Sequence, residues 1–200
     1  MTLETYRRKR RFGRTPEPRG TEDEPGQSGA SATSGRYVVQ RHRATRLHYD
    51  FRLEIGGVLA SWAVPRGPSL DPQQRRLAVR VEDHPLGYFS FEGVIPRSEY
   101  GGGDVIVWDW GRWTADASIG DASHAVRDGE LKFRLDGTKL RGTFVLVRMA
   151  WREGRKEQWL LIHRRDDAAV SGWDAEDHPE SVKTGRTNDE VVASRRRRRA

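Results

Sequence analysis

Apolar and polar residues alternate in short segments through the middle of the chain, with the two-residue period of a β-strand. Residues typical of turns separate these segments, among them Gly56 with Gly57 and the proline-bearing stretch 65–72. The strands predicted in this way are 37–42, 48–54, 58–64, 76–82, 88–94, 104–110, 129–135, 140–150 and 158–164. Short strands with turns between them and no long helical pattern are typical of an antiparallel β-barrel or sandwich.

The strand pattern holds only between residues 36 and 167, which we take as one mainly β domain. Residues 1–35 lack periodicity, so we expect a flexible basic arm there, ordered over 6–18 if it folds back onto the domain. Residues 168–200 are expected to form a linker-like segment and an arginine-rich tail. Within the domain, residues 114–128 fit either a short helix or a loop.

The composition narrows the class of protein. Two hundred residues with 9% aromatic side chains, including seven tryptophans, are enough for one compact domain with a real core. No apolar run reaches membrane-spanning length and no secretory signal is visible, so we expect a soluble, monomeric, cytoplasmic protein. The absence of cysteine excludes disulfides and leaves histidine and carboxylate groups as the metal ligands.

The net charge of +7 comes from the two ends of the chain. Residues 1–15 hold six basic side chains against one acid, residues 195–199 are five arginines, and the stretch between them is slightly acidic. Such clusters attract a polyanion but do not select one, and a terminal arginine run is as often only a solvated tail. The charge therefore permits a nucleic-acid partner without requiring one.

The segment 48–54 carries the most ionisable chemistry in the chain. Because strand side chains alternate, one face is apolar and the other is polar, with His48, Asp50, Arg52 and Glu54 on the polar face. A straight strand would place His42 roughly 26 Å from Asp50, so both residues serve one site only if the chain turns within 43–47. These residues include no Gly or Pro, which favours a wider loop over a two-residue hairpin.

His84 follows the predicted strand 76–82, where its side chain can lean over a barrel mouth. With His42 and Asp50 it makes a set of two imidazoles and one carboxylate, which suits Mn²⁺, Fe²⁺ or Zn²⁺. Each histidine taken alone is more often an exposed or hydrogen-bonded side chain than a ligand. That ordinary interpretation is kept for the remaining histidines, His124, His163 and His178.

Arg52 lies two residues beyond Asp50 on the same face and is a natural bidentate partner for a phosphate. A cross-strand ion pair with an acidic residue is an equally ordinary role for it, and Glu54 fits such a pair better than a metal site. The glycines 101–103 precede a strand instead of a helix, so they lack the context of a phosphate-binding loop.

Several motifs in order resemble the 3′-phosphoesterase domain of bacterial DNA ligase D, a repair ligase of non-homologous end joining. The similarity runs from about residue 6 to residue 166. The matching segments are TPEP at 15–18, YVVQRH at 37–42, LHYDFRLE at 47–54, SWAVP at 61–65, GPSLDP at 67–72, VEDHPLGY at 81–88, FEGVIP at 91–96, YGGG at 100–103 and WDWG at 108–111.

The resemblance implies a compact antiparallel β-barrel and a divalent-metal enzyme, preferably with manganese. Such an enzyme removes a 3′-terminal ribonucleoside and then the 3′-phosphate from DNA, leaving a 3′-OH. Carried over by motif, the metal ligands are His42, Asp50 and His84, the contacts to the scissile phosphate are His48, Arg52 and Tyr88, and the supporting residues are Gln40, Arg76 and Glu17. The implied partners are DNA or DNA–RNA 3′ ends in the bacterial nucleoid and a separate ligase, polymerase or end-binding protein.

The sequence departs from the family pattern in the arm, where Arg11 replaces the usual Asp or Asn of the motif that reads KRRF at 9–12 here. If that acid or amide helps the site, activity is weakened or its two steps are unbalanced. Arg66 stands where many members have Lys, which keeps the charge but changes its geometry. The stretch 181–187 resembles the linker of the fused ligases, which indicates a stand-alone version of the domain.

Two other functions fit parts of the pattern. His48 and Asp50 form a His-x-Asp pair, which is how an Fe²⁺ oxygenase presents two of its three facial ligands, although this leaves His42 and Arg52 unexplained. Alternatively, the chain is a barrel with basic arms that only binds DNA ends or a repair partner. The full ligand set argues against that second function, since a binding module has no need of it.

Overall fold

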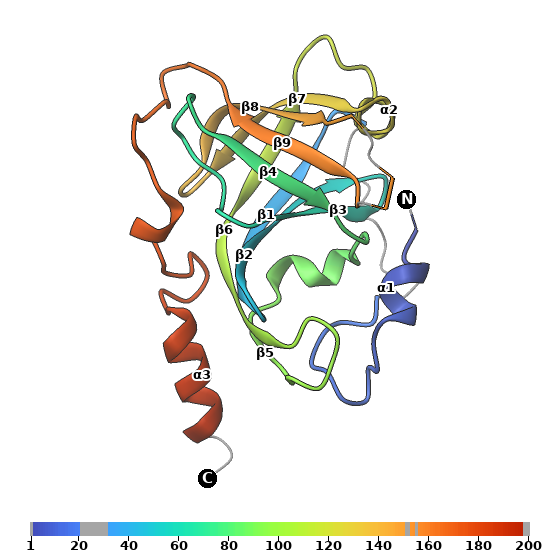
Figure 1. Cartoon of the computed structure of the whole chain (residues 1–200), viewed down its shortest axis with the longest axis vertical. Coiled ribbons are helices and arrows are strands. Elements are labelled where there is room, and N and C mark those ends of the chain that lie inside the picture. The colour runs from blue at the N-terminus through green and yellow to red at the C-terminus, as the bar shows by residue number, and fades with distance from the viewer. Residues whose placement is uncertain (1, 21–31, 151–152, 155, 198–200) are drawn as a thin grey trace.

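The structure is a computed structural model that describes residues 2–20, 32–150, 153–154 and 156–197. In these ranges the chain forms one antiparallel sheet with the strand order β1-β2-β3-β4-β9-β8-β7-β6-β5, and pairing of β1 with β6 closes eight of the strands into a barrel (Figure 1). The strands are β1 (Ser34–Arg43), β2 (Leu47–Ile55), β3 (Val58–Val64), β4 (Arg75–Arg80), β5 (Gly93–Ile95), β6 (Gly103–Ala115), β7 (Glu130–Gly137), β8 (Arg141–Arg148) and β9 (Gln158–His163). The predicted mainly β barrel is confirmed.

The strand predicted over 88–94 is wrong in its first half. A 3-10 helix, η1 (Leu86–Ser90), occupies that part, and only β5 (Gly93–Ile95) pairs with β6. The carbonyl groups of Tyr88 and Phe91 accept hydrogen bonds from the buried Gln40 side chain at 3.1 and 2.8 Å. This tertiary contact satisfies backbone groups that a strand would have paired with a neighbour, and local sequence gives no sign of it.

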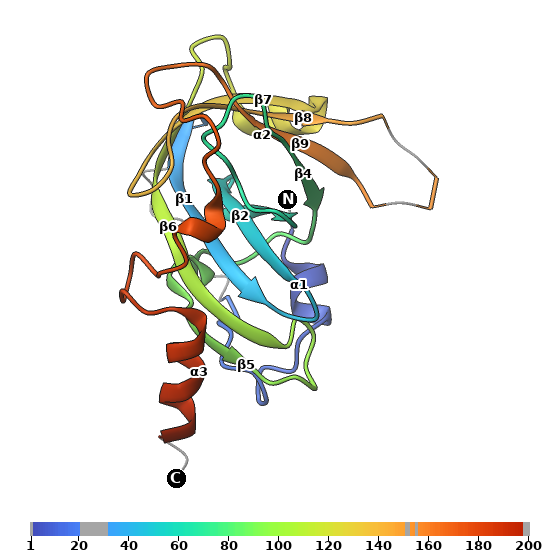
Figure 2. The same ribbon diagram turned by 60° about the vertical axis from the view of Figure 1, so that its left-hand side comes forward.

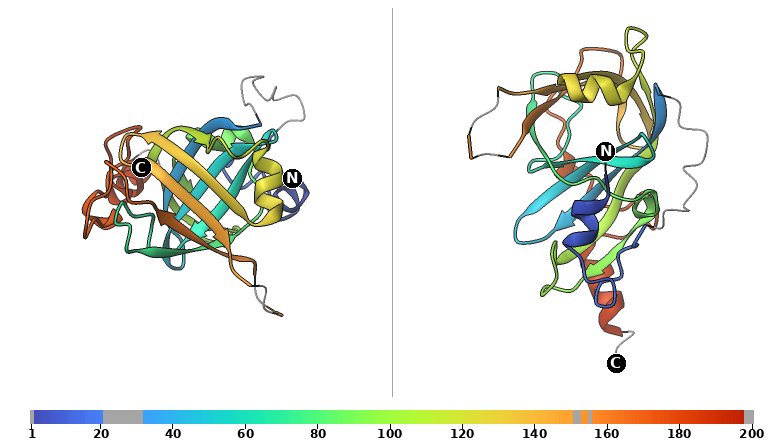
Figure 3. Two further views of the ribbon diagram at one scale, coloured as in Figure 1. Left: turned by 90° about the horizontal axis from the view of Figure 1, so that it is seen from above. Right: turned by 90° about the vertical axis from the view of Figure 1, so that its right-hand side faces the viewer.

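Besides η1, the helical elements of the described residues are α1 (Glu4–Arg8), α2 (Ala122–Asp128), η2 (Ala175–Asp177) and α3 (Asn188–Arg197). The first of these and the C-terminal segment lie on opposite sides of the barrel (Figure 3). α2 resolves the ambiguity over 114–128: Asp121 caps its first turn and Gly129, with φ of 103°, ends it. No helix within the described residues is long and apolar enough to cross a membrane.

Both terminal segments pack on the barrel. Residues 2–20 fold back onto it and bury Tyr6 and Glu17, which is the case in which we expected the arm to be ordered. The rest of the expected flexible arm, residues 21–31, lies outside the described residues. The C-terminal segment differs from the linker and tail expected from sequence, because η2 and α3 form there and Ala175, Asn188 and Val191 are buried.

The barrel core forms because strand residues alternate between an inner apolar face and an outer face. Phe51, Trp62, Trp108, Phe133 and Trp159 are among the aromatic side chains that fill it, each fully buried. The apolar face predicted for residues 48–54 points into this core, with Tyr49 against Trp108 at a ring distance of 5.0 Å. The register of the sheet is therefore fixed by which face carries the apolar side chains.

The outer face of β2 and β3 is buried as well, which is unusual for a small barrel. A second apolar cluster covers it, made of Tyr6, Leu59, Leu86 and Tyr88 with Phe12, Phe89 and Phe91 packed around them. The polar residues predicted on this face of β2 are therefore enclosed between the barrel wall and the arm. Burial on both faces is what brings charged side chains out of water here.

The turn predicted within 43–47 is confirmed. β1 pairs with β2 up to Arg43 and Leu47, so the loop is the three residues 44–46, and His42 becomes the direct cross-strand partner of His48. The hairpin thus brings the imidazoles of His42 and His48 into contact, with their ring centroids 4.7 Å apart.

The close pairing of β6 with β7 leaves no room for a methyl group at Gly111. Gly111 faces Gly137, and a Cβ atom at Gly111 would lie 2.1 Å from the carbonyl oxygen of Asp136. Because that oxygen belongs to the sheet backbone, it cannot move away. We expect Gly111→Ala to lower the free energy of unfolding by about 2 kcal/mol or more in urea unfolding.

The control for that experiment is Gly120→Ala, the same change at a position with no other atom within 4 Å of the new Cβ. Its free energy of unfolding should stay within about 0.5 kcal/mol of the wild type. Equal stability of the two variants would mean that β6 and β7 do not approach as closely as described.

Candidate active site

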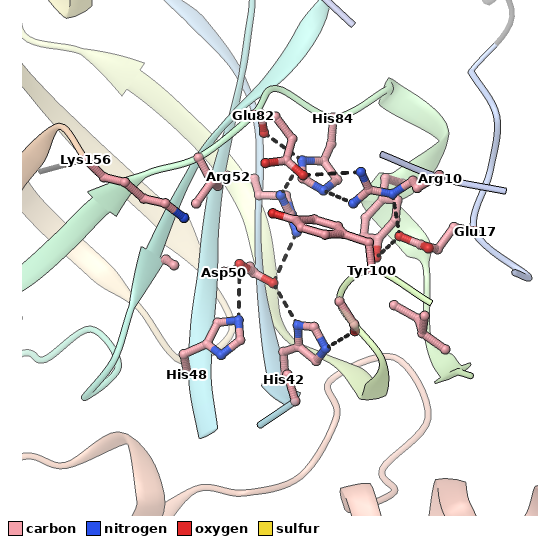
Figure 4. A pocket seen from close by; sticks show the side chains of 16 residues that line it. Arg10, Glu17, His42, His48, Asp50, Arg52, Glu82, His84, Tyr100 and Lys156 are labelled. Atoms are coloured by element: carbon pink, nitrogen blue, oxygen red, sulfur yellow. Dashed lines mark hydrogen bonds and ion pairs between the residues drawn. The ribbon is translucent and has the colours of Figure 1, made fainter. Parts of the chain in front are cut away.

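A cavity of about 310 Å³ lies against the outer face of β1, β2 and β3, beneath the N-terminal arm and the segment 81–102 (Figure 4). Strand alternation directs His42, His48, Asp50 and Arg52 into it, and Tyr88 reaches it from η1. The remaining charged and polar side chains that line it are Arg10, Glu17, Glu82, His84, Tyr100 and Lys156. Seven of the residues assigned to the site from sequence meet here: His42, Asp50, His84, His48, Arg52, Tyr88 and Glu17.

Two imidazoles and one carboxylate form a compact donor cluster. One ligand atom each from His42, His48 and Asp50 lies within 4.8 Å of the others. The carboxylate stands between the rings: its oxygens are 3.4 Å from Nδ1 of His42 and 3.7 Å from Nε2 of His48. Two histidines and one carboxylate are a common donor set for Mn²⁺, Fe²⁺ and Zn²⁺.

The outer hydrogen bonds of the two rings orient them for a cation. Nε2 of His42 lies 2.9 Å from the carbonyl oxygen of Gly101, and Nδ1 of His48 lies 3.0 Å from that of Arg46. A carbonyl oxygen only accepts, so each of these nitrogens carries the hydrogen and the inner nitrogen presents a lone pair to Asp50. Lone pairs facing a carboxylate repel it unless a cation or a further proton lies between them, so the residues fit a divalent metal.

Arg52 is held rigidly beside this cluster, with only 2% of the residue exposed. Its Nε donates to Gln40 at 2.9 Å and its Nη1 to Ser61 at 2.8 Å, while Nη2 lies 3.2 Å from Asp50. Gln40 does not line the cavity but stands behind Arg52 and fixes the plane of its guanidinium. The donor cluster and a fixed guanidinium, a group that commonly binds anions, therefore share one cavity.

The charges around Asp50 decide its protonation state. Burial alone would raise its pKa, but the guanidinium of Arg52 outweighs burial and holds the pKa well below its usual range. Asp50 is therefore a carboxylate at neutral pH and keeps both oxygens available to a cation.

His84 lies next to Arg52 instead of within the donor cluster. Its Nε2 accepts from Arg10 at 3.1 Å, and its Nδ1 lies 2.9 Å from the carbonyl oxygen of Glu82 and 2.8 Å from Arg52. Burial and the two guanidinium groups lower the pKa of His84 well below its usual value, so the ring is neutral. Since protein groups already contact both ring nitrogens, the geometry favours His48 over His84 as the third donor beside His42 and Asp50.

The N-terminal arm contributes a buried arginine that sequence reasoning did not assign. Nε of Arg10 lies 2.8 Å from Glu17 and its Nη1 lies 3.2 Å from Glu82, while its guanidinium stacks on Tyr6 at 3.8 Å. Two acids thus compensate one buried cation. The KRRF motif pointed to the arm, but only docking of the arm showed that Arg10 reaches His84.

Tyr88 and Lys156 mark two sides of the cavity. The Tyr88 hydroxyl donates to Glu17 at 3.2 Å, and burial followed by the charge of Glu17 raises its pKa well above the usual value, so the hydroxyl stays protonated. Lys156 enters from the opposite side, from the β8–β9 loop (Figures 2 and 4). Sequence reasoning missed Lys156, since nothing in the local pattern distinguishes it from a solvated loop lysine.

Two residues assigned from the resemblance lie elsewhere. Arg66 and Arg76 line neighbouring cavities near Pro65, which also include Asp174 and Glu176. Arg76 is 7% exposed, its Nε has no hydrogen-bond partner among the described residues, and its Nη2 lies 3.7 Å from Asp174. The structure therefore separates these two arginines from the donor cluster.

The other residues singled out from the sequence lie outside the cavity. Arg11, the departure from the family pattern, has an exposed side chain 3.7 Å from Glu99. Glu54 pairs with Arg36 at 2.7 Å, the ion-pair role expected for it. The remaining histidines are His124 in α2, His163 beside Asp166 and His178 stacked on Trp173.

Comparison with known proteins gives a consistent family. A family profile described as the DNA ligase D 3′-phosphoesterase domain matches residues 40–148. The "multifunctional non-homologous end joining protein LigD" of Pseudomonas aeruginosa is 50% identical over 92% of the chain, and the corresponding DNA repair protein of Mycobacterium tuberculosis is 42% identical over 81%. The matched parts make up 21% and 19% of those proteins, so the chain spans about a fifth of the length of these relatives.

The buried neutral state of His84 predicts that stability depends on pH. Because its pKa is lowered in the folded protein, the unfolded chain binds a proton at pH values where the folded protein does not. The stabilisation is fully present above the unfolded pKa of about 6.5 and is lost as the pH falls below it, by up to about 1.4 kcal/mol per pH unit. We expect His84→Gln to flatten this slope in urea unfolding between about pH 7 and pH 5.

His124→Gln is the matched control, because His124 is an exposed residue of α2. Its slope should equal that of the wild type. An unchanged slope in His84→Gln as well would contradict a neutral, buried His84.

Proposed function

The chain belongs to the family of DNA ligase D 3′-phosphoesterase domains, and on this basis we propose that it is a metal-dependent hydrolase of DNA 3′ ends. Its proposed substrates are primer–template ends that carry a terminal ribonucleotide or a 3′-phosphate. Removal of the ribonucleoside and then of the phosphate leaves a 3′-OH that a ligase can seal. The proposed setting is non-homologous end joining, the process named in the relatives' descriptions.

The observation that carries this proposal is the adjacency of two opposite binding functions. The His42, His48 and Asp50 cluster suits a divalent cation, and Arg52 touches the same carboxylate at 3.2 Å. Both suit a phosphate ester, because its non-bridging oxygens carry negative charge that a cation and a guanidinium neutralise together. The cavity is also walled by arm residues, which limits access of water to the charges within it.

We propose His42, His48 and Asp50 as the metal ligands and Mn²⁺ as the ion. The resemblance alone assigns His84 in place of His48, while the donor cluster supports His48. In this scheme Arg52 and Tyr88 contact the scissile phosphate, and His84 supports Arg52 and Arg10 beside it. Gln40 supports Arg52 from behind, and Glu17 supports Tyr88 and Arg10.

The bound metal would supply Lewis-acid polarisation of a phosphoryl oxygen and orient water for attack. Arg52, fixed by Gln40 and Ser61, would neutralise charge that develops on the non-bridging oxygens of the transition state. The raised pKa of Tyr88 keeps its hydroxyl protonated, and its single O–H, directed at Glu17 in the structure, would turn to the phosphate when substrate binds. The contacts of His84 with Arg10 and with the Glu82 carbonyl would fix the tautomer and the orientation of its ring. This wall of the site is therefore preorganised before substrate binds.

Arg66 and Arg76 would act at a distance from the scissile bond. They line a cavity beside Pro65 that contains no acidic side chain, where a further phosphate of the primer–template is a fitting ligand. The proposed partners are therefore DNA or DNA–RNA ends, with a ligase, polymerase or end-binding protein acting on the product. The protein is proposed to act as a monomer.

An Fe²⁺ oxygenase would use the same three donors, but it has no evident use for a guanidinium fixed against the carboxylate ligand. The guanidinium of Arg52, held directly beside the donor cluster, favours a phosphorylated substrate. A DNA-binding module without catalysis has no need of a carboxylate held between two imidazoles.

The central test uses a 5′-labelled DNA primer–template that ends in one ribonucleotide, incubated with Mn²⁺. We expect the wild type to shorten the primer first to a 3′-phosphate and then to a 3′-OH. Asp50→Asn removes the charge that binds the cation and should lower the rate by at least about 100-fold.

Asp167→Asn, the same chemical change at an exposed position, serves as the control and should react at the wild-type rate. Absence of product with the folded wild type, despite binding of Mn²⁺ and of the primer–template, would refute the enzymatic proposal in favour of a binding role. Turnover of 2-oxoglutarate with Fe²⁺ would support an oxygenase instead.

Two substitutions of the same kind separate a metal ligand from a residue that supports the arginines of the site. His48→Gln should weaken Mn²⁺ binding by about 10-fold or more, because it removes one of three donors. His84→Gln should leave Mn²⁺ affinity within about twofold and lower the rate of primer shortening, since His84 contacts Arg52 and Arg10. Electron paramagnetic resonance of free Mn²⁺ measures the affinities, and the reverse result would return the third ligand to His84.

A further inference from the structure

The C-terminal segment 174–189, here called the C-terminal strap, lies on the side of the β1–β2 hairpin opposite the cavity (Figures 1 and 2). We propose that the strap is a positioning element for the metal centre: it fixes the hairpin residues on either side of the cross-strand pair His42 and His48. The strap lies beyond residue 148, where the family profile ends. This inference rests on the proposed metal site and concerns residues that touch neither metal nor substrate.

The strap contacts residues of the two cross-strand pairs that flank the pair His42 and His48. Arg41 pairs across the strands with Tyr49, immediately beside the pair His42 and His48. Glu176 of the strap binds both members of that neighbouring pair: its oxygens lie 3.1 and 2.6 Å from Nε and Nη2 of Arg41, and it accepts a hydrogen bond from the Tyr49 hydroxyl. A bidentate carboxylate–guanidinium pair fixes orientation as well as distance.

A second strap residue joins β1 to β6 around His42. Asn188 is 1% exposed; its side-chain oxygen accepts from Nη1 of Arg41 at 2.7 Å. Its Nδ2 lies 3.3 Å from the carbonyl oxygen of Arg41 and 3.1 Å from that of Asp104. In the register His42 pairs with Val105 of β6, so the Asn188 amide links β1 and β6 beside this pair.

The end of the hairpin is held in the same way. Arg43 lies 2.7 Å from Asp104 and 2.7 Å from Asp189 of the strap. Asp189 is largely exposed, so this outer pair is worth little, and most of the fixation falls to Glu176 and Asn188. The hairpin is therefore bound at both neighbours of His42, on the side opposite the cavity.

The strap has its own anchors, so it can act as a support instead of following the hairpin. Its backbone carbonyl at His178 accepts from the Trp108 indole at 2.6 Å, and Val182 donates to the Val107 carbonyl at 2.9 Å. Glu92, beside β5, accepts from Ser181 and Thr184 at 2.6 and 2.5 Å. These bonds attach the strap to β6 and to the segment before β5 without involving the hairpin.

The physical consequence concerns the geometry of the donors. His42 and His48 come from the two strands of one hairpin close to its free end, where only three residues close the loop. A small change in the angle between the two strands alters the distance between their donor nitrogens. Loss of contacts that orient metal ligands commonly changes metal affinity 10- to 100-fold. Loosening the strap should therefore weaken metal binding more than it weakens the fold.

The test compares Glu176→Gln, Asn188→Ala and the double variant with the wild type in the full chain. Electron paramagnetic resonance of free Mn²⁺ gives the affinity, and amide hydrogen exchange without metal reports on the opening of residues 41–49. We expect about 10-fold weaker Mn²⁺ binding in the double variant, faster exchange over 41–49, and recovery of the wild-type kcat at saturating Mn²⁺. A general loss of structure would not be rescued by the ion in this way.

Glu130→Gln is the matched control, because Glu130 is a half-exposed partner of Lys132 on β7 and the charge change is the same. It should bind Mn²⁺ as the wild type does. Glu176→Gln, at a residue whose side chain is 47% exposed, keeps the test valid if the double variant fails to fold.

The outcomes separate this inference from the proposed function. Unchanged Mn²⁺ affinity in folded strap variants of an active enzyme would overturn the positioning role and leave the esterase proposal intact. Failure of the wild type to bind Mn²⁺ would overturn both, since there would be no metal centre to position. Wild-type binding of Mn²⁺ without esterase activity, with weaker binding in the variants, would support the strap and refute the proposed reaction.

Discussion

Burial of the ion pair between Asp50 and Arg52 is the constraint on which the candidate site depends. Both residues sit on the face of β2 that a small barrel normally leaves in water, and both are at least nine-tenths buried. Removing two charges from water is costly unless further hydrogen bonds complete their coordination. Gln40 and Ser61 complete that of Arg52, whereas the carboxylate faces two imidazole nitrogens and retains capacity for a cation.

Enclosure by the N-terminal arm makes this burial possible. Tyr6 extends the second apolar cluster over the outer face of the barrel, and Arg10 follows it into the cavity between Glu17 and Glu82. The arm thus adds apolar surface and alternating charge in the same few residues. Alternation of sign lets several ionised groups share a small volume, because each cation has an acid as its neighbour.

The two termini of the described chain act on the site from opposite sides. The arm closes the cavity over β2, while the C-terminal strap contacts the back of the β1–β2 hairpin through Glu176 and Asn188. The barrel between them supplies the strands and their register. A site assembled this way is sensitive to contacts far from the donors. The pairing of β1 with β2 ends one residue pair beyond His42 and His48, so these two residues lie close to the free end of the hairpin.

The barrel class, the alternation of 48–54 and the need for a turn after His42 were all predictable from the amino-acid sequence, because they follow from a two-residue period and from chain geometry. The motifs also identified the family and most of the charged and polar residues that line the cavity. Folding in three dimensions was needed to group His48 with His42 and Asp50, to bring Arg10 against His84, to separate Arg66 and Arg76 from the cluster, and to replace a predicted strand by η1. Local pattern fixes the face on which a side chain lies, whereas cross-strand register and the docking of distant segments fix its neighbours.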